Sequence, residues 1–539
     1  MKKIHNIIFI SLLLPLLSIS QNLDVQIEAI VNDYLATDAP GLAIMISQKE
    51  NVRYEKAFGL SNTSNGIKTR LDDQFRIGSI TKQFTAAAIL KLAEEGQLHL
   101  ENSINKFLPD ITNDKEITIH HLLQHTSGLG NQSDIASFDQ NSIDLNNYPE
   151  NMMQDIFSSP LKFSPGSDYA YSNLGYVVLG QIIEQVSDMP YELYLKKSFF
   201  EPLGMKNTGF EYIDDHLAPK SSGYTKVNGK YEQAAFIPMK ITYAAGGLVS
   251  NLRDLEKWNR SIMTGKVLPL NVVQQIQETN YLSEGNKTGY SYGWQIGNIQ
   301  GLKTVKHDGI VNGFTSMAIY VPEFDVFVTT LSNCDCYRDI EILTSKITAL
   351  SMGKPFPSHW VELTKKELQK FSGKYRRESS EMIITVHDNQ LMYYQNKGQK
   401  RKLIPVDSNK LQIEGSLEQL EFSFAEGTNS YSLVSLNDIT TWKKTESVIA
   451  YHSIVLDENK LEEYVGKYQV PNAFTFQVIR IGDTLYGQIG NDRKKMFCYD
   501  ADKFCASKTD ASLHFLRDQA GKIVKLSLSL DKDITAERI

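Results

Sequence analysis

The sequence predicts a layered α/β (α+β) domain followed by two small all-β domains, and three observations support this fold class. Stretches typical of strands and of helices are mixed from about residue 24 to residue 350. After the two prolines of "GKPFPSH", helical periodicity fades and short alternating runs bounded by Asn, Asp and Gly take over. This second part also repeats itself. We therefore expect one domain at 24–352, a linker at 353–362, and β domains at 363–447 and 456–539.

The composition is that of a globular protein. Of the 539 residues, 41% are hydrophobic and 22% are charged, which argues against disorder through most of the chain. The formal net charge is -7 and no basic run is present. Because an acidic surface repels phosphate, we expect a small-molecule partner and no nucleic acid.

The N-terminus has the pattern of a secretory signal peptide at residues 1–20. Lys2 and Lys3 precede an apolar run from Ile7 to Leu17, and small residues follow it. The run of about 11 residues is shorter than the roughly 20 needed to span a bilayer. We expect a secreted or periplasmic protein with no transmembrane anchor after cleavage of the signal.

The first domain begins and ends with strands. "GLAIMISQKENVRYEKAFGLSN", residues 41–62, resembles a β-hairpin, and "FRIGSITKQFTAAAILKLAEEG", residues 75–96, has the composition of a helix that stops at a glycine. Strand patterns return in "FTSMAIYVPEFDVFVTTLSN", residues 314–333. This order predicts one sheet built from the two ends of the domain, with helices between them.

The C-terminal part contains two copies of one module. "LQKFSGKY" at 368–375 matches "LEEYVGKY" at 461–468, an offset of 461 - 368 = 93. The same offset continues downstream, pairing Leu403 with Met496, Leu411 with Phe504 and Leu420 with Leu513. About eight short strands per copy fit a small closed barrel. We expect the repeated Gly-Lys-Tyr to be a turn and core element.

Ser79 and Lys82 are candidates for a nucleophile and its base. Residues three apart on a helix lie on one face, so the lysine amine can reach the serine hydroxyl. Burial and the positive field of a helix N-terminus favour the neutral amine that this chemistry needs. The spacing alone does not decide, because it recurs at Ser159 with Lys162, Ser351 with Lys354 and Ser529 with Lys532.

Two further motifs carry possible catalytic groups. Tyr171 and Asn173 lie in "YSN" before a helical run; a phenol can relay a proton and an amide can hold a substrate carbonyl. His307 and Gly309 lie in "KHDGIVNGF" ahead of a strand, in the only His-x-Gly of the chain. Glycine there lets a backbone approach a substrate closely, and histidine can donate a hydrogen bond or a proton.

In this order, "SITK", "YSN" and "HDG" resemble the three motifs of the penicillin-recognising serine hydrolases. That superfamily includes class C β-lactamases, D-Ala-D-Ala carboxypeptidases, D-aminopeptidases and related esterases. "HHLLQHTSGL", "FSPGSDYAYSNLGY", "EPLGMKNTGF" and "AAGGLVSNLRDLEKW" look similar too. The resemblance covers about residues 24 to 350. It implies a β-lactamase/transpeptidase-like fold, an antiparallel sheet flanked by helices plus a helical subdomain, here followed by lipocalin-like barrel repeats.

The resemblance also implies roles. Ser79 would be the acylated nucleophile, which gives its proton to Lys82 or Tyr171, and Tyr171 would then activate water for deacylation. Asn173 would position the substrate amide. The N–H groups of Ser79 and of Ile310, the residue after Gly309, would form the oxyanion hole.

The third motif departs from the pattern of many β-lactamases and carboxypeptidases, which carry Lys followed by Thr or Ser. Here His307 is followed by Asp308, a poorer clamp for a substrate carboxylate. His-x-Gly instead resembles the D-aminopeptidase and esterase branches. We expect an exported serine hydrolase that acts on a D-amino acid peptide, a peptidoglycan fragment or an ester, with help from His307 in releasing the acid. The alternatives are a β-lactamase, or a slow or non-catalytic sensor whose barrels bind a partner.

The cysteines and the remaining histidines suggest no metal and no cofactor. Cys334 and Cys336 have no second ligand pair at zinc spacing, so we expect buried or edge thiols. Cys498 and Cys505 flank a turn-like stretch, where a cross-strand disulfide is conceivable. The neighbouring histidines of "HHLLQH" match a structural helix of the family rather than a metal site. The oligomeric state stays open.

Overall fold

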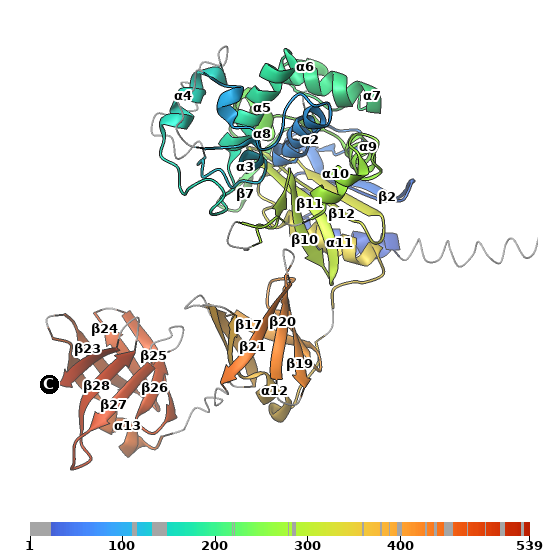
Figure 1. Ribbon diagram of the computed structural model, residues 1–539. Coiled ribbons are helices and arrows are strands. Elements are labelled where there is room, and N and C mark those ends of the chain that lie inside the picture. Colours follow the sequence, from blue (N-terminus) through green and yellow to red (C-terminus); the bar gives the residue numbers. More distant parts are fainter. Residues whose placement is uncertain are drawn as a thin grey trace, which may run out of the picture. The chain divides into compact units, whose positions relative to one another are not determined.

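The computed structural model describes most of the chain (Figure 1). The described residues are 23–109, 116–131, 148–217, 219, 221–278, 280–282, 287–357, 360–377, 380–387, 389–395, 401–425, 428–435, 439–446, 456–471, 473–490, 492–506, 512–529 and 533–539. The signal peptide expected at residues 1–20 lies outside them. Within these ranges, no helix has both the length and the apolar composition to cross a membrane.

A seven-stranded antiparallel sheet is the centre of the first domain. Its strand order is β2-β1-β13-β12-β11-β10-β9. The bounds are β1 (Leu42–Gln48), β2 (Asn51–Phe58), β9 (Tyr290–Ser291), β10 (Trp294–Ile299), β11 (Leu302–Val311), β12 (Phe314–Val321) and β13 (Val326–Ser332). Strand β1 pairs with β13 from Leu42↔Ser332 to Gln48↔Val326. The N- and C-terminal parts of the domain therefore share one sheet, as the sequence predicts.

Helices, short strands and single turns complete this domain. The helices are one over residues 23–34, α2 (Thr81–Glu94), α3 (Ile119–Leu123), α4 (Glu150–Ser158), α5 (Asn173–Ser187), α6 (Tyr191–Leu195), α7 (Glu201–Leu203), α8 (Tyr243–Gly246), α9 (Leu252–Met263), α10 (Leu270–Ile276) and α11 (Ile340–Ser351). The short strands are β3 (Leu60–Asn62), β4 (Ile67–Lys68), β5 (Phe75–Arg76), β6 (Tyr224–Val227), β7 (Lys230–Gln233) and β8 (Val249–Ser250). The turns are η1 (Gly78–Ile80), η2 (Ile104–Lys106), η4 (Lys196–Phe200), η5 (Asp215–Leu217) and η6 (Met239–Ile241).

The sheet is buried on both faces. Alternate residues of β1 point to opposite sides, so Ala43 and Met45 join one core and Leu42 and Ile44 join another. The first core contains buried residues of α2, α5 and α9, and the second contains residues of α11 and of the helix over 23–34. Figure 1 shows α2 and α5 on one side of the sheet and α11 on the other. The predicted layered fold class is confirmed.

Helix α2 forms where the Ala-rich segment predicts a helix, but it begins later than the sequence suggests. Ser79 lies on the 3₁₀ turn η1, and the α-helix starts at Thr81. The helix is almost wholly buried, including Lys82. It ends at Glu94, and the φ of 71° at Gly96, just beyond the C-cap Glu95, lets the chain reverse. Ser79 and Lys82 therefore meet across the junction of the two helical segments.

The C-terminal part contains two closed eight-stranded barrels. The first consists of α12 (Lys365–Phe371) and strands β14 (Gly373–Arg377), β15 (Ser380–His387), β16 (Gln390–Gln395), β17 (Arg401–Asp407), β18 (Lys410–Ile413), β19 (Gln419–Ala425), β20 (Thr428–Val434) and β21 (Ile439–Glu446). The second consists of α13 (Glu458–Tyr464) and strands β22 (Gly466–Gln469), β23 (Thr475–Ile481), β24 (Thr484–Ile489), β25 (Asp492–Asp500), β26 (Lys503–Ala506), β27 (Ser512–Arg517), β28 (Ile523–Ser529) and β29 (Asp533–Arg538). The predicted barrel fold is confirmed.

The repeated Gly-Lys-Tyr belongs to the barrel cores. Tyr375 and Tyr468 are buried, and their hydroxyls donate to the carbonyls of Phe371 at 2.8 Å and Tyr464 at 3.0 Å. Both bonds tie the first strand of a barrel to the helix before it. The tyrosine is a core element, as the sequence predicts.

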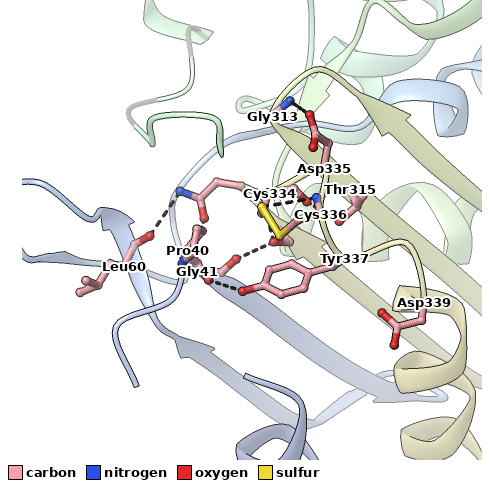
Figure 2. Close-up of a disulfide and its surroundings, with 12 residues drawn as sticks. Pro40, Gly41, Leu60, Gly313, Thr315, Cys334, Asp335, Cys336, Tyr337 and Asp339 are labelled. Atoms are coloured by element: carbon pink, nitrogen blue, oxygen red, sulfur yellow. Dashed lines mark hydrogen bonds between the residues drawn. A yellow bond between two sulfur atoms is a disulfide. The ribbon is translucent and has the colours of Figure 1, made fainter. Parts of the chain in front are cut away.

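The interpretation of Cys334 and Cys336 as thiols is wrong, because the two residues form a disulfide (Figure 2). Strand β13 ends just before them, and the chain turns at Asp335, which brings the two Cα atoms to 5.2 Å. That separation lies within the range of disulfides. The loop is also anchored, since Cys334 O accepts from Thr315 Oγ1 and Asp335 accepts from Gly313 N, each at 2.9 Å.

The suggested link between Cys498 and Cys505 stays a prediction. Cys498 is buried in the second barrel, and the side chain of Cys505 lies outside the described residues. The backbone register pairs Cys498 with Phe504 and Phe497 with Cys505.

Candidate active site

Ser79 lies where η1 touches the free edge of β11. A Cβ added to Gly78 would lie 2.9 Å from the backbone nitrogen of Ile310, and one added to Gly309 would lie 2.0 Å from Ile77 O. Gly78 also has a φ of 48°. Only glycine allows this approach, because any Cβ at Gly309 would overlap the turn. The contact places the backbone N–H of Ile310 beside the residue that precedes the nucleophile.

Lys82 is buried and surrounded by three oxygen atoms. Its Nζ lies 3.0 Å from Ser79 Oγ, 2.8 Å from Asn173 Oδ1 and 2.7 Å from Ala245 O. Burial lowers the pKa of Lys82 from 10.5 to about 7, against a smaller opposing effect of the Asp308 charge. The amine is therefore available as a base near neutral pH.

The N-terminus of α5 holds Tyr171 and Asn173 in place. Ser172 caps the helix by accepting from Gly175 N at 3.0 Å. Asn131 then bridges the two residues beside the cap: its Oδ1 accepts from Asn173 N at 2.7 Å, and its Nδ2 donates to Tyr171 O at 3.1 Å. The backbone of the "YSN" motif is fixed on both sides of the cap.

Tyr171 lies against both Ser79 and Lys82. Its hydroxyl forms a hydrogen bond with the Ser79 side chain, and Lys82 Nζ lies 4.8 Å from its ring centroid. Desolvation raises the pKa of Tyr171 well above its ordinary value, and the hydrogen bond with Ser79 opposes that only in part. Tyr171 is therefore a protonated phenol at neutral pH.

His307 is fully buried on β11 and uses both ring nitrogens. Its Nδ1 lies 2.6 Å from Asp308 O and its Nε2 lies 3.1 Å from the hydroxyl of Tyr290. A carbonyl can only accept, so Nδ1 carries the proton and Nε2 of the neutral ring accepts from Tyr290. Burial lowers the pKa of His307 to about 4. In this arrangement the ring has no spare donor for a substrate.

The structure brings the predicted site residues into one place. Lys82 forms hydrogen bonds with both Ser79 and Asn173. Tyr171 contacts Ser79, and the ring centroid of His307 lies 6.3 Å from that of Tyr171. Ser79, Gly309 and Ile310 meet through the contact between η1 and β11.

Sequence reasoning missed the groups that orient these residues. They are Asn131, His125, Tyr290 and the carbonyl of Ala245. His125 and Ala245 lie in stretches that resemble the family, but no local spacing connects any of the four with the motifs that they support.

The "HHLLQH" histidines have structural partners. His121 Nδ1 accepts from Thr118 N at 3.3 Å, and His125 Nδ1 accepts from Ser172 N at 3.1 Å. Across the described ranges, no group of three or more His, Cys, Asp or Glu residues could hold a metal ion. The first bond closes a helix cap, and the second supports "YSN".

The chain is similar in sequence to known proteins across the region that holds these motifs. The sequence profile of the family described as Beta-lactamase matches residues 27–339, and one described as a domain of unknown function (DUF3471) matches residues 454–539. Protein flp of Staphylococcus aureus (strain COL) is 29% identical over 321 residues, which cover 57% of this chain and 62% of that protein. The chain thus spans less than two thirds of that relative.

Two solved structures share the fold. The octameric penicillin-binding protein homologue from Pyrococcus abyssi is 26% identical with a TM-score of 0.55, and the match covers 79% of this chain and 99% of that one. A D-stereospecific amidohydrolase from Streptomyces sp. is 25% identical with a TM-score of 0.51, over 62% of this chain and 98% of the other.

Proposed function

Because the chain belongs to the beta-lactamase family of serine hydrolases, we propose that it hydrolyses small amides or esters through an acyl-enzyme on Ser79. The observation that carries this proposal is the buried Lys82 amine 3.0 Å from Ser79 Oγ. The candidate substrates are D-amino acid peptides, peptidoglycan fragments and esters.

Hydrogen bonding around Lys82 fits a base. A neutral amine has two N–H groups and one lone pair. Asn173 Oδ1 and Ala245 O can only accept, so they take the two N–H groups. The lone pair is then left for the hydroxyl proton of Ser79. Between the two bases that the motif allows, Lys82 and Tyr171, the low pKa of Lys82 and the high pKa of Tyr171 favour Lys82.

Tyr171 acts as a proton relay. After Ser79 attacks, its proton is on Lys82 and the substrate oxygen carries the negative charge, which the N–H groups of Ser79 and Ile310 stabilise. Tyr171 gives its proton to the leaving group and regains one from the Lys82 ammonium. Water then attacks the acyl carbonyl, and its proton passes through Tyr171 to Lys82. As the acid leaves, Lys82 gives this proton to Ser79 Oγ, which restores the neutral amine and the serine hydroxyl.

Asn173 and His307 position the reacting groups. Asn173 orients Lys82 through its side-chain oxygen, which leaves its amide nitrogen to hold a substrate carbonyl. His307, neutral and engaged at both nitrogens, fixes the carbonyl of Asp308 and with it the peptide that leads to Gly309 and Ile310. This role replaces the proton transfer expected of His307 from the sequence alone.

We also propose that the protein is exported to the periplasm or secreted. The N-terminal pattern at residues 1–20 supports this, and so does the Cys334–Cys336 disulfide, because disulfides persist in oxidising compartments.

The proposal is tested with the full chain and a panel of D-aminoacyl amides, D-Ala-D-Ala peptides, short nitrophenyl esters and a chromogenic cephalosporin. We expect turnover of at least one amide or ester, and a fall of roughly 10³-fold or more in kcat for Ser79→Ala. Undiminished turnover in Ser79→Ala would overturn the assignment, and so would wild-type protein that turns over no member of the panel.

A further inference from the structure

Asp308 lies between His307 and Gly309, beside the nucleophile. Strand β10 pairs with β11 only from Leu302 to Lys306. In the described part of the sheet, residues 307–311 therefore pair with β12 alone, and their other edge faces the turn that carries Ser79. The Asp308 side chain is 40% exposed at this open edge.

The carboxylate of Asp308 has few partners among the described residues. Its Oδ1 accepts from Gln295 Nε2 at 3.0 Å. The nearest cationic candidate is the ring of His307, whose Nδ1 lies 3.8 Å from Oδ1. That ring is neutral, because burial lowers its pKa to about 4. Asp308 therefore presents a negative charge that His307 does not neutralise.

This charge reaches the groups that touch Ser79. Burial is the main cause of the pKa shifts of Lys82, Tyr169 and Tyr171, and the Asp308 charge adds an upward contribution to the pKa of each. Among the described residues, Asp308 is the charged side chain whose field acts on Lys82. A cation bound near Ser79 would thus be stabilised and a carboxylate repelled, most strongly where water is excluded.

We propose that Asp308 is a specificity-determining residue that selects substrates with an ammonium group close to the scissile carbonyl, such as aminoacyl amides and esters with a free amino group. The inference rests on the proposed function and deepens it by naming the substrate class. It also accounts for the motif: where many relatives grip a carboxylate with Lys and Thr or Ser, this chain has a neutral histidine and an acid.

The test compares three nitrophenyl esters of similar size: the D-alanine ester, which carries an ammonium, the neutral propionate ester and the anionic succinate monoester. Each kcat/KM is measured at pH 6.5 and divided by the rate of spontaneous hydrolysis of that ester. We expect wild-type protein to prefer the D-alanine ester over propionate at least tenfold, with succinate last. In Asp308→Asn this preference should fall at least tenfold, while the propionate value changes less than about threefold.

Glu323→Gln is the matched control. Glu323 is an exposed carboxylate in the turn between β12 and β13, at the end of the sheet away from Gly309, so this variant removes the same charge elsewhere. It should keep the wild-type preference. Raising the salt concentration to 1 M should reduce the preference of wild-type protein, because screening weakens exposed charges.

The outcomes separate the two proposals. Equal loss for all three esters in Asp308→Asn, or an unchanged preference, overturns the inference and leaves the hydrolase assignment intact. Calorimetry with D-alaninamide and propionamide on Ser79→Ala adds a readout without turnover, and equal affinity for both amides would also contradict the role of Asp308. Failure of wild-type protein on every ester overturns the proposed function itself, and the inference with it.

Discussion

At the scale of single residues, Lys82 decides whether the site is reactive. An exposed lysine with a pKa of about 10.4 is neutral in fewer than about one molecule in a thousand at pH 7. Burial lowers the pKa of Lys82 to about 7, so roughly half of the molecules carry the free amine at that pH. Burial removes the hydration that would stabilise a charged Lys82, and it leaves a neutral amine that can act as a base next to Ser79.

The pH dependence of acylation follows from this value. Ser79 can lose its proton only to neutral Lys82, so kcat/KM for an uncharged ester should rise with pH, about tenfold per unit below pH 7, and level off above about pH 8. Lys82→Arg, which stays protonated, should lose activity roughly 10³-fold or more. The measurement is a kcat/KM profile from pH 5 to pH 9. A flat profile, or one that falls with rising pH, would exclude Lys82 as the base.

At the scale of elements, the proposed oxyanion hole depends on the contact between β11 and η1. A Cβ at Gly309 would lie 2.0 Å from Ile77 O, a backbone atom that cannot swing aside. Gly309→Ala should therefore push the two elements apart and displace Ile310 N from Ser79. We expect kcat to fall about 10²-fold or more, the size of effect seen when an oxyanion donor is lost. Steady-state kinetics with a nitrophenyl ester measures this.

Gly301→Ala is the control for Gly309→Ala, because it tests the effect of lower stability without disturbing the contact between β11 and η1. Gly301 has a φ of 83° in the turn between β10 and β11, and no atom lies within 4 Å of an added Cβ. That variant should lower the free energy of unfolding by about 1–2 kcal/mol and keep its activity. If both variants lost activity alike, general destabilisation rather than the contact would be the cause.

The sequence predicted the helices and strands that carry the site residues better than it predicted the hydrogen-bond partners of those residues. Ala-rich composition and Gly96 were enough to place α2, because they act within one segment. Ala245, whose carbonyl accepts from Lys82, is 163 residues away along the chain. Sequence periodicity does not predict a contact between residues so far apart. Burial also sets the pKa values of Tyr171 and His307, and burial becomes visible only in the folded chain.

At the scale of the whole molecule, the catalytic domain and the barrels have separate cores. Of the described residues, one compact unit holds 23–356 and the other holds the two barrels. Among the described residues, none of the site residues named above lies beyond Ile310. A protein shortened to residues 1–356 should therefore fold and keep its kcat within about threefold, as ester turnover and thermal unfolding can measure. A loss of turnover with intact folding would show that the barrels complete the site.

The repeat shows what long-range pattern can predict. An offset of 93 residues was visible in a few apolar positions, and it carries Lys365 and Phe371, the ends of α12, onto Glu458 and Tyr464, the ends of α13. Turn and core positions of a barrel are fixed by local chemistry, so a duplicated sequence keeps them in register. The Cys334–Cys336 disulfide escaped prediction because it depends on the turn after β13.

The proposed mechanism requires that Ser79 becomes acylated while Lys82 takes its proton. Mass spectrometry after brief exposure of the full chain to a fluorophosphonate or a nitrophenyl ester tests it most directly. We predict one adduct, located on the peptide that contains Ser79, which is absent in Ser79→Ala and strongly slowed in Lys82→Arg. An unlabelled wild-type protein, or an adduct on another residue, would exclude Ser79 as the nucleophile.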